Sequence, residues 1–304
     1  MSKISRRDFI RATGAGLAVA GLVPINRAVA QTGTELVVVE GGLVKAAGKA
    51  IEALGGISRF VKSGAKVLIH PNISFASEPK RGANTDPELV AEVSRLCVAA
   101  GAKEVLVTDN PLMPSELCAW RSGIRDAMSK VKGATLRYIS DESYYKEVSI
   151  PKGKDLKKTW LLKPLLEADL IINMPRAKVH GQTMVTLGLK NLMGISYDRK
   201  DWHSKHNLSQ ALADVATFIK PQLTIIDASN VMVDNGPGGP GTLEPLNLLV
   251  AGTNPVETDA VMVSLSDWGG KKYKPEDVKH LKAASEHGLG RLDVNAIKPA
   301  RLKV

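Results

Sequence analysis

The sequence predicts an α/β fold with a mostly parallel sheet and helices on both of its faces, in Rossmann-like layers. Short runs rich in β-branched residues alternate with helical patterns along most of the chain. These runs are almost continuously apolar, as strands are when both faces of a parallel sheet are covered. The segments between them are amphipathic, which favours helices that pack on the sheet and connect its strands.

The expected elements follow one another in regular order. The strand-like runs are residues 35–40, 66–71, 103–109, 135–140, 169–175, 223–229 and 246–252. The helical patterns cover residues 44–56, 86–102, 115–131, 160–168, 208–220, 255–270 and 275–290. Asp86 and Pro87 suit a helix start, while Gly101 and Gly288 suit helix ends. We find no repeat and no low-complexity linker, so residues 31–304 are expected to form one α/β domain, and a division into two lobes stays open.

Residues 1–30 have the pattern of a twin-arginine (Tat) signal peptide. Arg6 and Arg7 precede a short apolar region, which ends in a small-residue cleavage motif. That region is interrupted by glycines and is shorter than the roughly 20 residues that a membrane span requires. We therefore expect export by the Tat translocase, a periplasmic location and no stable membrane span after cleavage. Whether the signal is cleaved stays open.

Charge and cysteine content limit the partners and cofactors that we expect. The chain has 41 basic and 31 acidic residues, a net charge of +10, and without residues 1–30 it keeps 36 and 30, a net charge of +6. This surplus is spread along the chain with few aromatic residues among it, so we expect no nucleic-acid partner. Cys97 and Cys118 are expected to be buried thiols. Since a cluster requires four cysteine ligands, we expect no iron–sulfur cluster.

Polar residues follow the fifth predicted strand, where open α/β sheets bind ligands. Lys178 and His180 come soon after residue 175, and Lys190 and Asn191 follow an apolar stretch, residues 183–189. If that stretch is buried, Lys190 needs an anion, a carboxylate or a covalent attachment. Alternatively, its amine extends to solvent. The buried arrangement predicts a site for a small anionic ligand, with His180 as an acid or base.

A histidine pair raises the question of a metal ion. His203 and His206 are three residues apart, so a helix would place them on one face. Because neutral imidazoles bind nickel, zinc and iron, the pair favours one of these metals as a cofactor whose identity is unknown. A solvated loop before the helix at 208–220 explains the pair equally well. His70 and Asn72, at the end of the second strand, could join the site.

Other polar residues could bind the ligand or serve the fold. Asp227 ends the sixth strand, and Asn235 and Gly236 begin a glycine-rich turn whose amides could approach an anion. That turn could equally be a rigid connection. Asp259 lies early in a helix, where an acid complements the helix dipole or orients a ligand or histidine.

Several segments together resemble a known family. INMPRAKVHGQTMVTLGLKNLMGI, LTIIDASNVMVDNGPGGPG, TNPVETDAV and ASEHGLG resemble the domain of unknown function 362 (DUF362) family, over roughly residues 67–290. Many members have a ferredoxin-like cysteine cluster that this chain lacks, so electron transfer is not implied. The spacing of His180, Lys190 and His206 is similar to that in the nickel-pincer lactate racemases. This similarity implies an acid/base role for His180, cofactor attachment at Lys190 and nickel ligation by His206.

These observations lead to one functional hypothesis and one alternative. The hypothesis is an exported protein that binds a metal or organic cofactor and performs acid–base chemistry on a small anionic substrate, as a racemase or isomerase does. The alternative is a non-catalytic periplasmic protein that binds a ligand or takes part in cofactor maturation. The sequence leaves open whether the protein is an enzyme.

Overall fold

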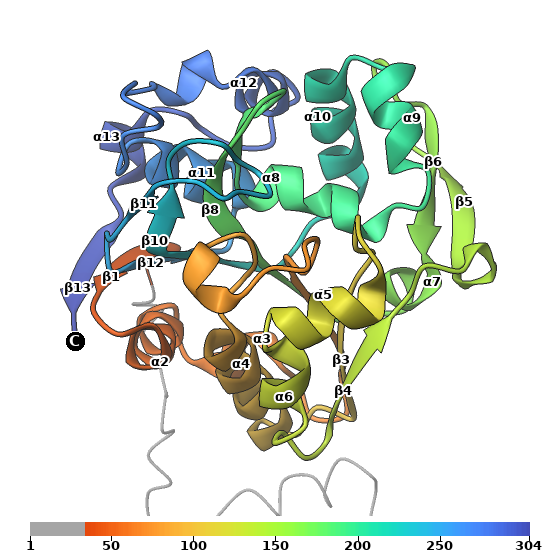
Figure 1. The fold of residues 1–304 in the computed structure, drawn as a ribbon, viewed down its shortest axis with the longest axis vertical. Coiled ribbons are helices and arrows are strands. Elements are labelled where there is room, and N and C mark those ends of the chain that lie inside the picture. The colour runs from red at the N-terminus through yellow and green to blue at the C-terminus, as the bar shows by residue number, and fades with distance from the viewer. Residues whose placement is uncertain (1–33) are drawn as a thin grey trace, which may run out of the picture. The chain divides into compact units, whose positions relative to one another are not determined.

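A computed structural model describes residues 34–304 of the chain (Figure 1). The signal peptide expected at residues 1–30 therefore lies outside the described residues. Within the described part, no helix has both the length and the apolar character needed to cross a membrane.

The central sheet has the strand order β13-β1-β12-β10-β7-β2-β3-β4. These strands are β1 (Leu36–Glu40), β2 (Lys66–Pro71), β3 (Glu104–Asp109), β4 (Ala134–Tyr138), β7 (Leu170–Met174), β10 (Leu223–Met232), β12 (Leu248–Gly252) and β13 (Ala300–Lys303). Neighbours are parallel from β10 to β4, and β1 is parallel to β13. The predicted mostly parallel sheet is confirmed.

Strand β12 is antiparallel to both of its neighbours, β1 and β10. Residues 253–259 therefore leave the sheet at the end opposite to the carboxyl ends of the parallel strands, where ligand contacts were expected. An apolar strand pattern carries no information about strand direction, so the sequence could not reveal this reversal.

Several short strands were not predicted. They are β5 (Tyr145–Ser149), β6 (Lys158–Leu162), β8 (Arg176–His180), β9 (Met184–Thr186) and β11 (Leu243–Glu244). The helix predicted at 160–168 is wrong in its first part, because β6 pairs with β5 and helix α7 covers only Lys163–Leu166. Pro164 explains this boundary, since proline is tolerated only in the first turn of a helix.

Helices cover both faces of the sheet, as predicted (Figure 1). Those on one face are α2 (Leu43–Ala53), α3 (Ile57–Phe60), α4 (Pro87–Ala99), α5 (Ser115–Arg121) and α6 (Ile124–Met128). On or beside the other lie α8 (Gly188–Asn191), α9 (Arg199–Ser204), α10 (Leu208–Phe218), α11 (Pro255–Val263), α12 (Lys279–Glu286) and α13 (Val294–Ile297). Short 3₁₀ turns are η1 (Pro79–Arg81), η2 (Glu142–Tyr144), η3 (Leu192–Ile195) and η4 (Pro275–Asp277). The helix predicted at 115–131 is interrupted at Gly123, whose φ is 74°.

Two hydrophobic cores flank the sheet because side chains alternate along each strand. In β1, Val37 and Val39 face the core under α2 and α4, whereas Leu36 and Val38 face the core under α10 and α11. A fully buried aliphatic side chain stabilises a fold by about 1.5–3 kcal/mol, so both helical layers are strongly held. Cys97 and Cys118 are buried free thiols, as predicted.

Candidate functional site

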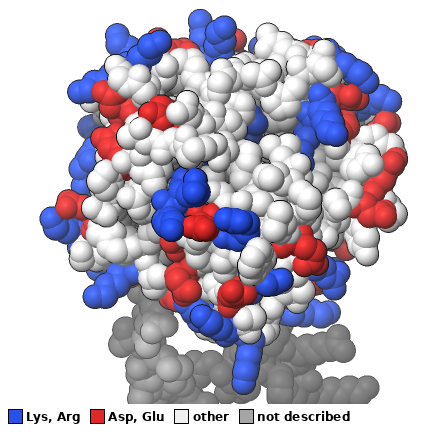
Figure 2. Space-filling view, viewed as in Figure 1, with Lys and Arg blue, Asp and Glu red and all other residues white. Residues whose placement is uncertain are grey.

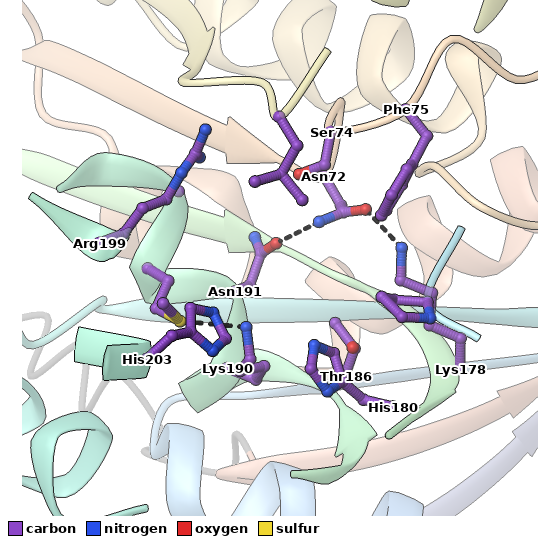
Figure 3. Close-up of a pocket in the computed structure, with 14 residues that line it drawn as sticks. Asn72, Ser74, Phe75, Lys178, His180, Thr186, Lys190, Asn191, Arg199 and His203 are labelled. Carbon is purple, nitrogen blue, oxygen red and sulfur yellow. Dashed lines mark hydrogen bonds between the residues drawn. The ribbon is translucent and has the colours of Figure 1, made fainter. Parts of the chain in front are cut away.

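A pocket opens where strands β2 and β3 and the β8–β9 hairpin end (Figure 3). Its lining residues are Asn72, Ser74, Phe75, Leu112, Lys178, His180, Thr186, Lys190, Asn191, Met193, Gly194, Arg199, His203 and Pro237. Its volume is about 70 Å³, counted as the space open to the centres of water molecules. A single water requires about 10–15 Å³ on this measure, so the pocket has room for several waters or one small ligand.

The lining is basic. Lys178, Lys190 and Arg199 contribute amine and guanidinium groups, and none of the lining residues, all within 34–304, is an aspartate or glutamate. Asp109 is the carboxylate whose charge reaches Lys178 and Arg199. Its oxygens already accept hydrogen bonds from the backbone N–H groups of Ile73 and Asn110, at 2.8 Å each. On the face shown in Figure 2, basic and acidic side chains are interspersed around an uncharged area.

Lys178 is fully buried and is held by a directed chain of hydrogen bonds. Its Nζ donates to Asn72 Oδ1 at 2.8 Å, and Asn72 Nδ2 donates to Asn191 Oδ1 at 3.0 Å (Figure 3). Asn191 Nδ2 donates to Asn173 Oδ1 at 2.9 Å, and Asn173 Nδ2 donates to the Gly188 carbonyl at 2.9 Å. Burial holds the pKa of Lys178 well below its usual value, and the nearby Arg176 and Lys190 add to this effect. The amide chain therefore fixes the position of an amine that is costly to protonate.

Lys190 lies on α8 with its amine in the pocket. Its Nζ donates to Met193 Sδ at 3.0 Å, and a thioether is a weak acceptor. Within residues 34–304, no carboxylate lies within ion-pair distance of this amine. Burial lowers the pKa of Lys190 to about 8, and Arg199 contributes to the shift. Of the two alternatives that the sequence left open for this lysine, the structure shows the partly buried one.

Arg199 is a pocket residue that the sequence did not indicate, because it lies in a polar segment that reads as a solvated loop. It begins α9 and donates through Nη2 to the Pro111 carbonyl at 2.6 Å and through Nη1 to the Asn110 carbonyl. Both acceptors are neutral. The guanidinium is therefore a fixed positive charge at the pocket wall, and among residues 34–304 no carboxylate pairs with it.

His180 ends β8, and hydrogen bonds fix its tautomer. Its Nδ1 accepts from the backbone N–H groups of Gln182 at 3.1 Å and Thr183 at 3.4 Å. Burial lowers its pKa to about 3, and the nearby Lys190 contributes. The neutral ring therefore carries its proton on Nε2 and can donate a hydrogen bond into the pocket. This arrangement favours a hydrogen-bond donor over the proton-transferring base expected from the sequence.

The two candidate metal ligands lie in different surroundings. His203 lines the pocket, where its Nδ1 contacts Gln182 Oε1. His206 is not a lining residue, and its Nδ1 lies 3.0 Å from Asp155 Oδ1. Within residues 34–304, no three His, Cys, Asp or Glu side chains are placed to bind one metal ion. Metal binding by this histidine pair therefore stays a prediction.

Asp227 and Asp259 contact protein groups. Asp227 Oδ2 lies 2.5 Å from Arg176 Nη1 in a buried ion pair. Asp259 accepts hydrogen bonds from the backbone N–H groups of Gly188 at 2.7 Å and Leu189 at 2.8 Å, which positions helix α8. Burial raises the pKa of Asp259 to about 7. Neither aspartate lines the pocket.

The glycine-rich turn packs closely against β8. A Cβ atom at Gly236 would lie 2.1 Å from the Val179 carbonyl oxygen, so only glycine fits this approach. Asn235 has a positive φ of 47°, a conformation that asparagine adopts more readily than most residues. The turn reaches the pocket through Pro237, whereas Asn235 and Gly236 do not line it.

Thr186 and the end of β2 complete the pocket. Thr186 lines the pocket, and its hydroxyl is buried from solvent and has no hydrogen-bond partner within the described part of the chain. No sequence signal distinguishes this threonine from others in apolar strands. Asn72, which the sequence left open as a further site residue, lines the pocket. His70 lies behind it, with Nδ1 3.0 Å from the Thr108 carbonyl and Nε2 2.9 Å from the Asn191 carbonyl.

Comparisons with known proteins identify the family. The thylakoid-associated protein sll1697 of Synechocystis sp. is 29% identical over 238 residues, which cover 74% of this chain and 70% of that protein. The lactate racemase apoprotein from Thermoanaerobacterium thermosaccharolyticum is 14% identical, with a TM-score of 0.46. That likeness covers 75% of this chain, which spans 57% of the racemase chain. The family described as "Domain of unknown function (DUF362)" matches residues 67–264, more than half of the chain, so the protein belongs to the DUF362 family.

Proposed function

We propose that the pocket binds a small anionic molecule and carries out acid–base chemistry on it. The observation that carries this proposal is the set of three basic side chains, Lys178, Lys190 and Arg199, in a lining without acidic residues. Buried basic groups without an acidic partner are costly to charge, so a bound anion would favour their charged forms and stabilise the site.

The acid–base part of the proposal rests on Lys190 and His180. The pKa of Lys190, lowered to about 8, lets its amine accept or release a proton near neutral pH. His180, whose pKa is lowered to about 3, stays neutral and donates through Nε2 to a substrate oxygen as negative charge develops on it. Thus the lysine exchanges the proton and the histidine stabilises the oxygen.

A binding experiment with simple anions tests the first part. Malonate, phosphate and sulfate are titrated by calorimetry into the wild type, Arg199→Met and the control Arg95→Met, whose guanidinium pairs with Glu92 on an exposed helix face. Loss of one charged hydrogen bond costs about 1.5–3 kcal/mol, which corresponds to roughly 10–150-fold weaker binding for Arg199→Met. The control should bind normally. If none of the three anions binds the wild type, the proposal is wrong.

A second experiment separates catalysis from binding alone. Each enantiomer of lactate and malate is incubated with the protein in D₂O, and loss of the α-proton signal is followed by NMR. Exchange that disappears in Lys190→Met supports the acid–base proposal. Anion binding without exchange of any of these substrates favours the non-catalytic ligand-binding alternative.

Export is a separate part of the proposal, supported by the sequence of residues 1–30. We expect the protein to pass through the Tat translocase to the periplasm. Residues 1–30 fused to green fluorescent protein should give periplasmic fluorescence, because only folded export yields a fluorescent product there. The double change Arg6→Lys and Arg7→Lys should block it. Unchanged export of the double variant would argue against this route.

A further inference from the structure

Lys190 differs from the other basic groups of the pocket in what it contacts. The amine of Lys178 donates to two oxygen acceptors, those of Asn72 and Ala83. Arg199 also donates to two carbonyl oxygens. The hydrogen bond of Lys190 is to the sulfur of Met193. Within the part of the chain that the structure describes, its nitrogen therefore has no strong acceptor that would favour the ammonium form.

This environment makes the Lys190 amine a good nucleophile. Burial lowers its pKa to about 8 from an ordinary value of 10.5. At pH 7 the neutral fraction is therefore roughly 300-fold greater than for an exposed lysine. A desolvated lysine next to another cationic group is an arrangement that activates an amine towards carbonyl carbon. Figure 3 shows the rings of His180 and His203 on either side of Lys190 in that view, so the amine is surrounded by groups that can contact a ligand.

We propose that Lys190 forms a reversible imine with the carbonyl carbon of a small 2-oxo acid bound in the pocket. This inference rests on the proposed function and names a substrate class for the same site. Arg199 and Lys178 hold the carboxylate of the acid. Nε2–H of His180 donates to the carbonyl oxygen as the Lys190 nitrogen approaches. For a ligand with such a carbonyl, the neutral amine attacks carbon instead of accepting a proton.

The reaction balances without a further reactant. The lone pair of the Lys190 nitrogen forms a bond to the carbonyl carbon, and the π electrons of the C=O bond move to oxygen. Two protons pass from nitrogen to that oxygen, which leaves as water while the C=N bond forms. Starting from the ammonium form, one carbonyl compound gives one protonated imine and one water. No electron is gained or lost, so no oxidant or reductant is required.

Reductive trapping tests the inference on the intact protein. The protein is incubated with pyruvate or glyoxylate, reduced with sodium borohydride, digested and mapped by mass spectrometry. We expect one carboxyalkyl group on the peptide that contains Lys190, at least about tenfold more than on the peptide with Lys132, an exposed lysine outside the pocket. Lys190→Met should lose this adduct. Equal labelling of both lysines in the wild type would overturn the inference.

The outcome also distinguishes this inference from the proposed function. Malonate has two carboxylates but no ketone or aldehyde carbonyl, so it tests anion binding alone. If malonate and pyruvate bind the wild type and no adduct forms at Lys190, the imine is refuted while the anion site stands. If malonate, phosphate, sulfate and pyruvate all fail to bind and no adduct forms, both proposals fail. Because the adduct is read from the wild-type protein, the test does not depend on the folding of a variant.

Discussion

Replacing Lys190 with methionine should stabilise the ligand-free protein near neutral pH. Methionine has a similar length and no charge, and it can pack against Met193, the present partner of the amine. The substitution removes a protonation that burial disfavours, since the pKa of Lys190 is lowered to about 8. A substitution in the pocket that increases stability would show directly that the wild-type lysine is held at an energetic cost.

The size and sign of the effect follow from proton linkage. The unfolded chain keeps a lysine pKa near 10.5, so at pH 7 the shift to about 8 destabilises the folded protein by about 3 kcal/mol. Between pH 8 and 10.5 the unfolded state binds more protons, so wild-type stability rises with pH relative to the variant. Above about pH 10.5 both states are deprotonated and the difference vanishes. For a domain of this size the advantage at pH 7 corresponds to roughly 6 °C in Tm.

The assay is urea unfolding of the wild type and Lys190→Met between pH 7 and pH 10.5, in a buffer without multivalent anions. Lys132→Met is the matched control, because this lysine is exposed and should change stability by less than about 0.5 kcal/mol. Adding malonate should stabilise the wild type more than Lys190→Met. A variant that is less stable than the wild type at pH 7, or a difference independent of pH, would refute the reasoning.

Three further substitutions test other contacts. Thr186→Val removes a buried hydroxyl that has no hydrogen-bond partner among residues 34–304, so thermal unfolding should show unchanged or higher stability. Arg176→Met leaves Asp227 buried without its cation and should cost about 3–5 kcal/mol in urea unfolding. Gly236→Ala places a Cβ atom 2.1 Å from a backbone oxygen and should lower Tm, whereas Gly181→Ala, with nothing within 4 Å, should not. Equal Tm values for the two alanine variants would contradict the close packing of the turn.

The sequence predicted the sheet well because burial leaves a local signature. Strands β1, β2, β3, β7, β10 and β12 lie where continuous apolar runs predicted them. Asp86 caps helix α4 as expected, accepting hydrogen bonds from the backbone N–H groups of Glu88 and Leu89. Strand direction and the short hairpin strands β8 and β9 depend on contacts between distant segments. These features have no comparable signature in a single sequence.

The pocket was predicted in part, and the missing part has a physical explanation. Lys178, His180, Lys190 and Asn191 follow one another closely, so their position after a strand was enough to place them together. Arg199 comes from a polar helix start and reaches the site only because α9 folds against the loop after β3. A charged residue in such a segment is usually solvated, so its role becomes visible only when its two acceptors are known.

The aspartates show why residue type alone could not distinguish a residue that binds the ligand from one that stabilises the fold. Asp227 and Asp259 are as buried as any pocket residue, yet one neutralises Arg176 and the other anchors the start of α8. Each thereby fixes a segment that carries a basic group of the pocket. Acids placed in the lining would have satisfied those basic groups and removed the reason to bind an anion. A site for a small anion therefore requires that nearby carboxylates bind other groups of the protein. Burying the pocket amines without carboxylate partners among residues 34–304 costs stability, and the two hydrophobic cores on either side of the sheet offset this cost.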